Sequence, residues 1–207
     1  MHAQGKGNGR GERWEIDPEH SELRFSLRHI VVSTIEGRFQ SWGGEMLFDP
    51  DDVSRARIHV WVDVASIDTD SAERDAHVRS AEFLDTDRFP RAQFVATDVA
   101  PRAGGQATVT GRLQLHGTTR YVDLQVVSDR AWLDDLGRPR ATYVVTGRID
   151  RQVFGLHWNQ DLDVGGIVVS DKVAIDARVE VVRTTHADFA RAEPAGAEAA
   201  ASDRAPA

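Results

Sequence analysis

The chain has 207 residues and no cysteine, which excludes a disulfide framework, a thiolate zinc site and a cysteine nucleophile. Its 33 acidic and 25 basic residues give a formal net charge of −8. Nucleic acid and anionic membrane surfaces are therefore poor partners, because both attract positively charged proteins. A chain of this length can bury a sizeable core as one domain.

The two ends of the chain differ from its middle. Residues 1–13 are polar and glycine-rich and lack the apolar stretch of a signal peptide, so we expect a flexible N-terminal arm. No apolar run is long enough to cross a membrane, so we expect a cytoplasmic protein without membrane insertion. A chain from which a signal peptide had been removed would show the same pattern. Residues 184–207 are rich in Ala and Glu and are predicted to form a disordered tail, which leaves residues 14–183 as the folded domain.

Within this domain, apolar and polar residues alternate with the period of two that is typical of half-buried strands. In 22–28, for example, Leu23, Phe25 and Leu27 alternate with charged and polar residues. Stretches with this pattern are 22–28, 57–64, 108–116, 121–127, 143–149 and 172–181, and less regular strands fit 36–48 and 91–99.

One segment, 71–80, interrupts the alternation. It has good helix formers and a capping serine, Ser71, so it predicts a short helix. Further helical turns are expected at 29–33 and 151–154.

Turn-forming residues stand between the predicted strands, at 49–52, 102–105, 116–118 and 134–137. About eight strands joined mostly by hairpins predict an all-β fold, either an antiparallel barrel or a sandwich. A barrel of about eight strands is filled by its own side chains or holds one small ligand.

Several short motifs occur in a fixed order along the domain. They are W-E-I-D-P-E-H-S (14–21), F-S-L-R-H (25–29), G-R-F (37–39) followed by Gly44, S-I-D-T (66–69), R-D-A-H-V-R-S (74–80), F-L-D (83–85), F-P (89–90), G-R-L-Q-L-H-G (111–117) and R-Q-V-F-G (151–155). In this order they resemble the motifs of the YceI-like family of lipocalin-like proteins. The departures are Val78, Gln114 and Val153, where the family usually has Leu, Thr and Asp.

The resemblance implies an eight-stranded antiparallel, lipocalin-like barrel with a long apolar cavity and short helices that cap it. It also implies binding of a polyisoprenoid-like or other lipophilic small molecule, often by a homodimer. The family usually carries no catalytic machinery and no cofactor.

The alternation predicts which side chains face such a cavity, because successive side chains of a strand point to opposite faces. The phase is ambiguous in 57–64, where Trp61 lies opposite to Val60. The predicted wall consists of Phe25, Leu27, Ile58, Val60, Leu113, Leu115, Leu124 and Tyr143, with Phe39, Trp42, Phe83 and Trp158 nearer the ends and His20, His29 and Arg79 at the mouth. Small residues in the same phase, Gly111, Gly147 and Ala177, would leave space for a ligand.

Polar residues offer few alternatives to this site. No two histidines have a metal-binding spacing, so no metal is expected. The cluster Arg74, Asp75, His77 and Arg79 could bind a polar head group, but its anchoring of the helix to the barrel rim is the favoured interpretation. No nucleophile elbow, P-loop or dinucleotide-binding glycine pattern occurs, so no catalytic residue is predicted.

Three functions remain open at this point. The first is a carrier that binds a hydrophobic small molecule in the barrel. The second is an enzyme that uses the same cavity to fold and cyclise a lipophilic intermediate, which needs orientation more than reactive groups. The third is a filled barrel that serves as an interaction domain, which would have no cavity.

Overall fold

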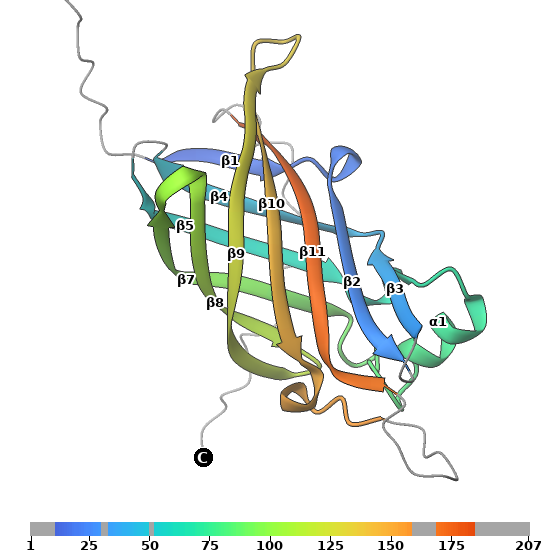
Figure 1. The fold of residues 1–207 in the computed structure, drawn as a ribbon. Helices are drawn as coiled ribbons and strands as arrows, with labels where there is room; N and C mark the ends of the chain where they lie inside the picture. The colour runs from blue at the N-terminus through green and yellow to red at the C-terminus, as the bar shows by residue number, and fades with distance from the viewer. Residues whose placement is uncertain (1–10, 30–32, 50–51, 159–168, 185–207) are drawn as a thin grey trace, which may run out of the picture.

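The computed structural model describes residues 11–29, 33–49, 52–158 and 169–184. In these residues, eleven strand segments form one antiparallel sheet that curves round on itself (Figure 1). The segments are β1 (Glu12–Ile16), β2 (Glu22–His29), β3 (Ser33–Phe39), β4 (Trp42–Asp49), β5 (Asp52–Asp63), β6 (Ile67–Asp68), β7 (Arg91–Arg102), β8 (Gln106–Leu115), β9 (Thr118–Leu133), β10 (Pro139–Asp150) and β11 (Val169–Arg183).

Three of the barrel strands are each split into two segments: β1 with β2, β3 with β4, and β5 with β6. Their pairing shows this, because β2 pairs with β3 while β1 pairs with β4, and β3 pairs with β6 while β4 pairs with β5. From β7 to β11 each strand pairs with the next, and β11 returns to pair with both β1 and β2. The result is a closed, eight-stranded antiparallel barrel with its strands in sequence order.

The predicted strands occur in this fold, with two differences. The stretch 36–48 contains both β3 and β4, because the chain bends at Gln40 and Ser41. Segments β1 and β6 were not predicted, since they are too short to show a clear alternation. Strand β1 begins at Glu12, within the residues assigned to the arm, and its pairing with β11 closes the barrel and excludes the sandwich.

The predicted helix is α1 (Ala72–Arg79), which lies between β6 and β7. Its N-cap is Ser71, whose hydroxyl oxygen accepts a hydrogen bond from the Arg74 amide at 3.4 Å. The turn predicted at 151–154 is a 3-10 helix, η4 (Arg151–Phe154), and shorter ones are η1 (Pro18–His20), η2 (Val64–Ser66) and η3 (Ala103–Gly105). Of the turn predicted at 29–33, residues 30–32 lie outside the described ranges, and His29 and Ser33 belong to strands. None of these helices is long and apolar enough to span a bilayer.

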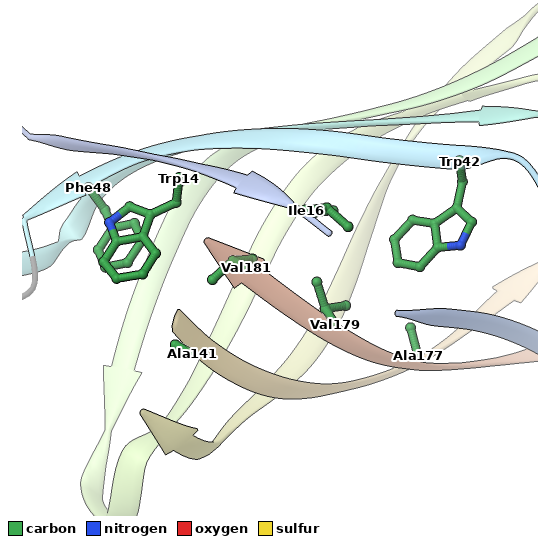
Figure 2. Packing of buried hydrophobic residues seen from close by; sticks show 8 residues of the cluster. All are labelled: Trp14, Ile16, Trp42, Phe48, Ala141, Ala177, Val179 and Val181. Carbon is green, nitrogen blue, oxygen red and sulfur yellow. The ribbon is translucent and has the colours of Figure 1, made fainter. Parts of the chain in front are cut away.

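One end of the barrel is packed with large side chains. Trp14 of β1 and Phe48 of β4 stack with their ring centroids 5.4 Å apart, and Val181 beside them is completely buried (Figure 2). Burying a phenylalanine of this kind stabilises a fold by about 1.5–3 kcal/mol. This cluster closes the end of the barrel that lies away from α1.

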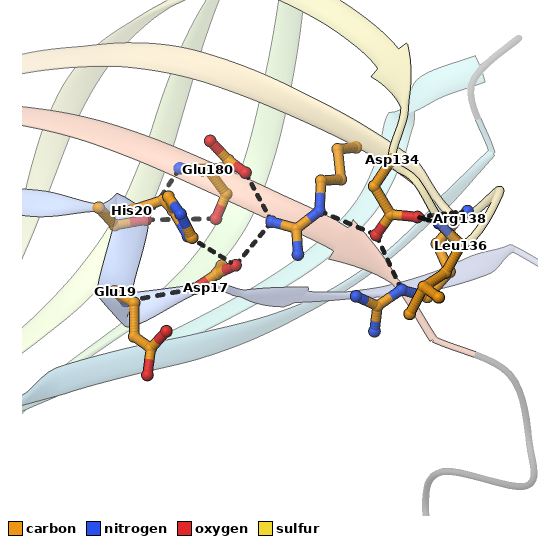
Figure 3. A network of polar contacts seen from close by, with 9 residues as sticks. Asp17, Glu19, His20, Asp134, Leu136, Arg138 and Glu180 are labelled. Carbon is orange, nitrogen blue, oxygen red and sulfur yellow. Dashed lines mark hydrogen bonds and ion pairs between the residues drawn. The ribbon is translucent and has the colours of Figure 1, made fainter.

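The C-terminal end of β1 leads into a network of charged side chains. Between β1 and β2 the chain leaves the sheet for η1, and the Asp17 amide donates to the Glu180 carbonyl of β11 at 2.9 Å. The guanidinium of Arg140, from β10, donates to the carboxylates of Asp17 and Glu180 at 2.6 Å each. It also donates to Asp134, in the turn between β9 and β10, at 3.1 Å (Figure 3). Arg140 therefore links the break between β1 and β2 to both β10 and β11.

These contacts shift the ionisation of the carboxylates. Burial alone would raise the pKa of Asp134, but hydrogen bonds from the Arg138 amide and from the side chains of Arg140 and Arg138 lower it to about 2. The pKa of Asp17 is also lowered, since hydrogen bonds from Arg140 and His20 outweigh its burial. A carboxyl group with a lowered pKa stabilises the fold above its unfolded pKa, and this stabilisation is lost as the pH falls through the folded value.

We therefore expect Arg140→Met to lower the melting temperature at neutral pH by about 4–8 °C, because it leaves partly buried carboxylates without their charged donor. The difference from the wild type should narrow between about pH 4 and pH 2, as Asp17 and Asp134 become protonated in both proteins. Thermal melts across this pH range measure it.

The matched control is Arg178→Met. The guanidinium of Arg178 also bonds a carboxylate, Asp129 at 2.9 Å, but its side chain is 60% exposed. This change should cost less than about 1 kcal/mol. A pH-independent difference for Arg140→Met would show that charge pairing does not hold the network.

Candidate ligand-binding cavity

A cavity of about 580 Å³ runs inside the barrel, walled by the inward side chains of the described strands. This volume falls within the range of small-molecule sites, about 300–1,000 Å³. The filled barrel considered from the sequence is therefore excluded. Twelve of the predicted residues line the cavity: Phe25, Leu27, Phe39, Trp42, Ile58, Val60, Phe83, Leu113, Leu115, Leu124, Tyr143 and Trp158.

The structure resolves the ambiguous phase of β5. Ile58, Val60 and Val62 face the cavity, whereas Trp61 is on the opposite face of the strand. There the Trp61 ring lies over Gly43 of β4, and a Cβ atom at that position would come within 2.9 Å of it. A glycine on the neighbouring strand thus makes room for a tryptophan outside the barrel.

The glycines that face inward do not themselves leave empty space, contrary to the sequence-based expectation. A Cβ atom at Gly111 would lie 2.3 Å from the Phe94 ring, and one at Gly147 would lie 2.6 Å from Leu124. Phe94 and Leu124 both line the cavity. Each glycine therefore lets a neighbouring large side chain lie close to the wall.

The mouth of the cavity is polar and lies at α1. Thr69, Ser71, Glu73, Arg74 and His77 contribute to its lining. Aromatic side chains complete this rim: the Trp158 ring is 4.7 Å from that of His77 and 5.9 Å from that of Phe83. The cavity thus changes from polar at the mouth to apolar inside.

Charged residues of α1 hold the helix against the rim. The Asp75 carboxylate accepts hydrogen bonds from the Thr69 amide and hydroxyl at 3.0 and 2.6 Å, and Arg74 donates to the same hydroxyl at 2.8 Å. Arg79 donates to the carbonyls of Ala65 and Ile67. These contacts confirm the anchoring interpretation for Arg74, Asp75 and Arg79.

A buried arginine holds the other side of the mouth in place. Arg151 of η4 is only 1% exposed, and its guanidinium donates to the carbonyls of Leu156, Trp158, Val169 and Ser170. Burial lowers its pKa, which Asp171 and Asp150 partly offset. By binding the Trp158 carbonyl it positions that residue beside α1. The sequence motif R-Q-V-F-G marked this residue without indicating its role.

Of the three residues predicted at the mouth, His20 and Arg79 are placed differently. His20 lies in η1 with its ring nitrogen 3.1 Å from Asp17, and neither His20 nor Arg79 is among the described residues that line the cavity. The prediction for His20 was wrong because the chain leaves the sheet between β1 and β2, and His20 lies in the 3-10 turn η1 that joins them. His29 pairs with Ser33 and Val169 in the sheet, but its side chain lies outside the described part of the structure.

Of the described residues, one group has the geometry to hold a metal ion: Asp17, His20 and Glu180, whose ligand atoms lie within 4.8 Å of one another. The Arg140 guanidinium already bonds both of its carboxylates. The group is therefore part of the structural network rather than an acidic site with free ligands.

Together, the closed barrel, the apolar cavity and the rim formed by α1 define a lipocalin-like barrel protein. The profile of the YceI-like domain matches residues 14–181, and the chain belongs to this family. A UPF0312 protein of Vibrio cholerae is 36% identical over 137 residues, which cover 66% of this chain and 72% of the relative. A UPF0312 protein of Shewanella denitrificans is 34% identical over 164 residues, which cover 79% and 83%.

Solved structures share the fold at lower identity. BcnA of Burkholderia cenocepacia matches with a TM-score of 0.70 at 24% identity, covering 80% of this chain and 98% of the other. A polyisoprenoid binding domain from Saccharophagus degradans, implicated in plant cell wall breakdown, matches with a TM-score of 0.63 at 16% identity, covering 83% and 98%.

One cavity residue carries an ionisable group away from the mouth. Burial raises the pKa of Tyr143 above its ordinary value of 10.0. The unfolded chain then releases this proton at a lower pH than the folded protein, so stability is fully present below the unfolded pKa and is lost as the pH rises through the folded one.

We expect the free energy of unfolding to fall more steeply above about pH 10 in the wild type than in Tyr143→Phe, by at most about 1.4 kcal/mol per pH unit. Urea unfolding at a series of alkaline pH values measures both slopes. Equal slopes would contradict a phenol that stays neutral inside the barrel.

Proposed function

We propose that the protein binds a long, lipophilic molecule of polyisoprenoid type in the barrel cavity. The observation that carries this proposal is an apolar cavity of about 580 Å³ with a polar mouth at one end. Each methylene group that moves from water into such a cavity contributes about 0.8 kcal/mol. A long apolar chain therefore binds without many polar contacts.

The structures of the two barrel ends both support entry of a ligand beside α1. At one end, Trp14, Phe48, Ala141 and Val181 are buried and form a floor beneath the cavity. At the other, α1 and Trp158 frame the mouth, and Arg79 of the helix donates hydrogen bonds to carbonyls of η2 and β6. A ligand would enter beside α1 with its apolar chain directed towards the floor.

The architecture of the relatives is consistent with this proposal. The Saccharophagus degradans domain with the same fold is described as polyisoprenoid binding. The two proteins share the barrel, while the side chains of this chain decide which molecule fits its cavity.

Native mass spectrometry of the protein purified from its own cells tests the proposal. We expect a bound lipophilic mass that organic solvent releases. If the protein converted an added linear precursor into cyclic products, the enzyme hypothesis would replace the carrier. A protein that purifies empty and takes up no apolar probe would contradict binding altogether.

A substitution in the wall tests the location. Leu113 lines the cavity, whereas the next residue, Gln114, is exposed. We expect Leu113→Asp to weaken uptake of a fluorescent apolar probe at least about 10-fold, because an unpaired carboxylate in an apolar site is costly.

Gln114→Asp introduces the same charge one residue away and serves as the matched control, with affinity close to that of the wild type. Circular dichroism melts verify that both variants fold. Equal losses in the two variants would place the ligand outside the barrel.

A further inference from the structure

Among the described residues that line the cavity, one carries a hydroxyl group far from the mouth. Tyr143 projects from β10, where it pairs with Val179 of β11, and it packs against the cluster that closes the barrel floor. The other lining residues with a hydroxyl, imidazole or charged side chain come from the mouth segments: Thr69, Ser71, Glu73, Arg74, His77 and Arg151. The Tyr143 hydroxyl is therefore separated from them by an apolar stretch.

The surroundings of Tyr143 are apolar. The cluster against which it packs includes Ile16, Trp42 and Val179, all of which also line the cavity. Ala177 and Val145, which face each other across β11 and β10, line the same wall. No charged group shares this part of the described cavity lining.

The hydroxyl of Tyr143 makes no hydrogen bond with the described part of the chain. Its oxygen nevertheless borders open space, unlike the indole nitrogen of Trp14, which protein atoms cover completely. Leaving a buried hydroxyl without a partner destabilises the protein, and a phenylalanine of nearly the same shape would avoid that cost. Because burial raises its pKa, the phenol stays protonated and can both donate and accept.

We infer that Tyr143 binds an oxygen-bearing group on the end of the ligand that enters the barrel first. This inference rests on the proposed function and specifies its ligand class: a long apolar chain with a hydroxyl, carbonyl or ether oxygen at the inserted end. A pure hydrocarbon terminus would leave the phenol unpaired at the floor. An oxygenated terminus would form a hydrogen bond with the phenol. The protein would therefore bind ligands with an oxygenated inserted end more tightly than pure hydrocarbon chains.

Two probes that differ only at the inserted end test the inference. Each carries a disulfonated naphthylamine fluorophore, whose two negative charges keep it in water at the mouth, linked to a linear dodecyl chain. The chain ends in a methyl group in one probe and in a hydroxyl group in the other. Fluorescence titration gives Kd for both probes with the wild type, Tyr143→Phe and Tyr121→Phe.

The variant Tyr121→Phe is the control, because it makes the same chemical change in a side chain that is 69% exposed. We expect the ratio of the methyl-probe Kd to the hydroxyl-probe Kd to fall about 5- to 10-fold in Tyr143→Phe, which is the worth of one hydrogen bond. In Tyr121→Phe the ratio should equal that of the wild type. Thermal melts confirm that both variants are folded.

The failures of the two proposals are distinguishable. If both probes bind and Tyr143→Phe leaves the ratio unchanged, the hydroxyl does not recognise the inserted end, and the inference is wrong while the carrier function stands. A gain of affinity by the same factor for both probes would equally overturn it, since the hydroxyl would then only disfavour burial. If neither probe binds the wild type, the proposed function itself fails.

Discussion

The closure of the barrel depends on a single edge of β11, which pairs with two separate segments of the chain. Val181 pairs with Ile16 of β1, and Ile175 pairs with Phe25 of β2. Between these pairs the first strand uses more residues than β11, so it must leave the sheet for the turn η1. The backbone bond from Asp17 to Glu180 and the guanidinium of Arg140 hold this break in place. Segment β1 lies at the packed floor of the barrel, and β2 extends from the break towards the mouth.

Many polar residues of the family motifs hold the barrel together, whether or not they also line its cavity. Asp17 and His20 lie in the network at the break, and Arg79 bonds loop carbonyls beneath α1. Arg151 is buried among the carbonyls that precede and begin β11. Arginine is suited to this role, since one guanidinium can donate hydrogen bonds to several carbonyl or carboxylate oxygens that have no backbone partner in the sheet. The wall itself is made of ordinary apolar side chains, which many sequences can supply.

The distribution of polarity along the cavity gives the proposed function its physical basis. An apolar middle supplies affinity in proportion to the surface that it removes from water. The polar groups at the mouth and the single phenol at the floor contribute orientation, because each leaves a cost when its partner is absent. Glycines at 111 and 147 assist by allowing Phe94 and Leu124 to lie close against the neighbouring strand.

The sequence by itself determined most of the strands and, outside β5, their inward faces, because alternation depends only on the backbone geometry of each strand. It therefore predicted the barrel wall, from Phe25 to Tyr143, and a helix over 71–80, which the structure has at Ala72–Arg79. Local pattern could not place His20, since the break before β2 arises from pairing with a strand about 160 residues away, as the bond from Ser21 to Glu180 shows. It also could not assign the role of Arg151 or the isolation of the Tyr143 hydroxyl. Both depend on which groups from distant strands lie nearby in space, and only the closed tertiary structure decides that.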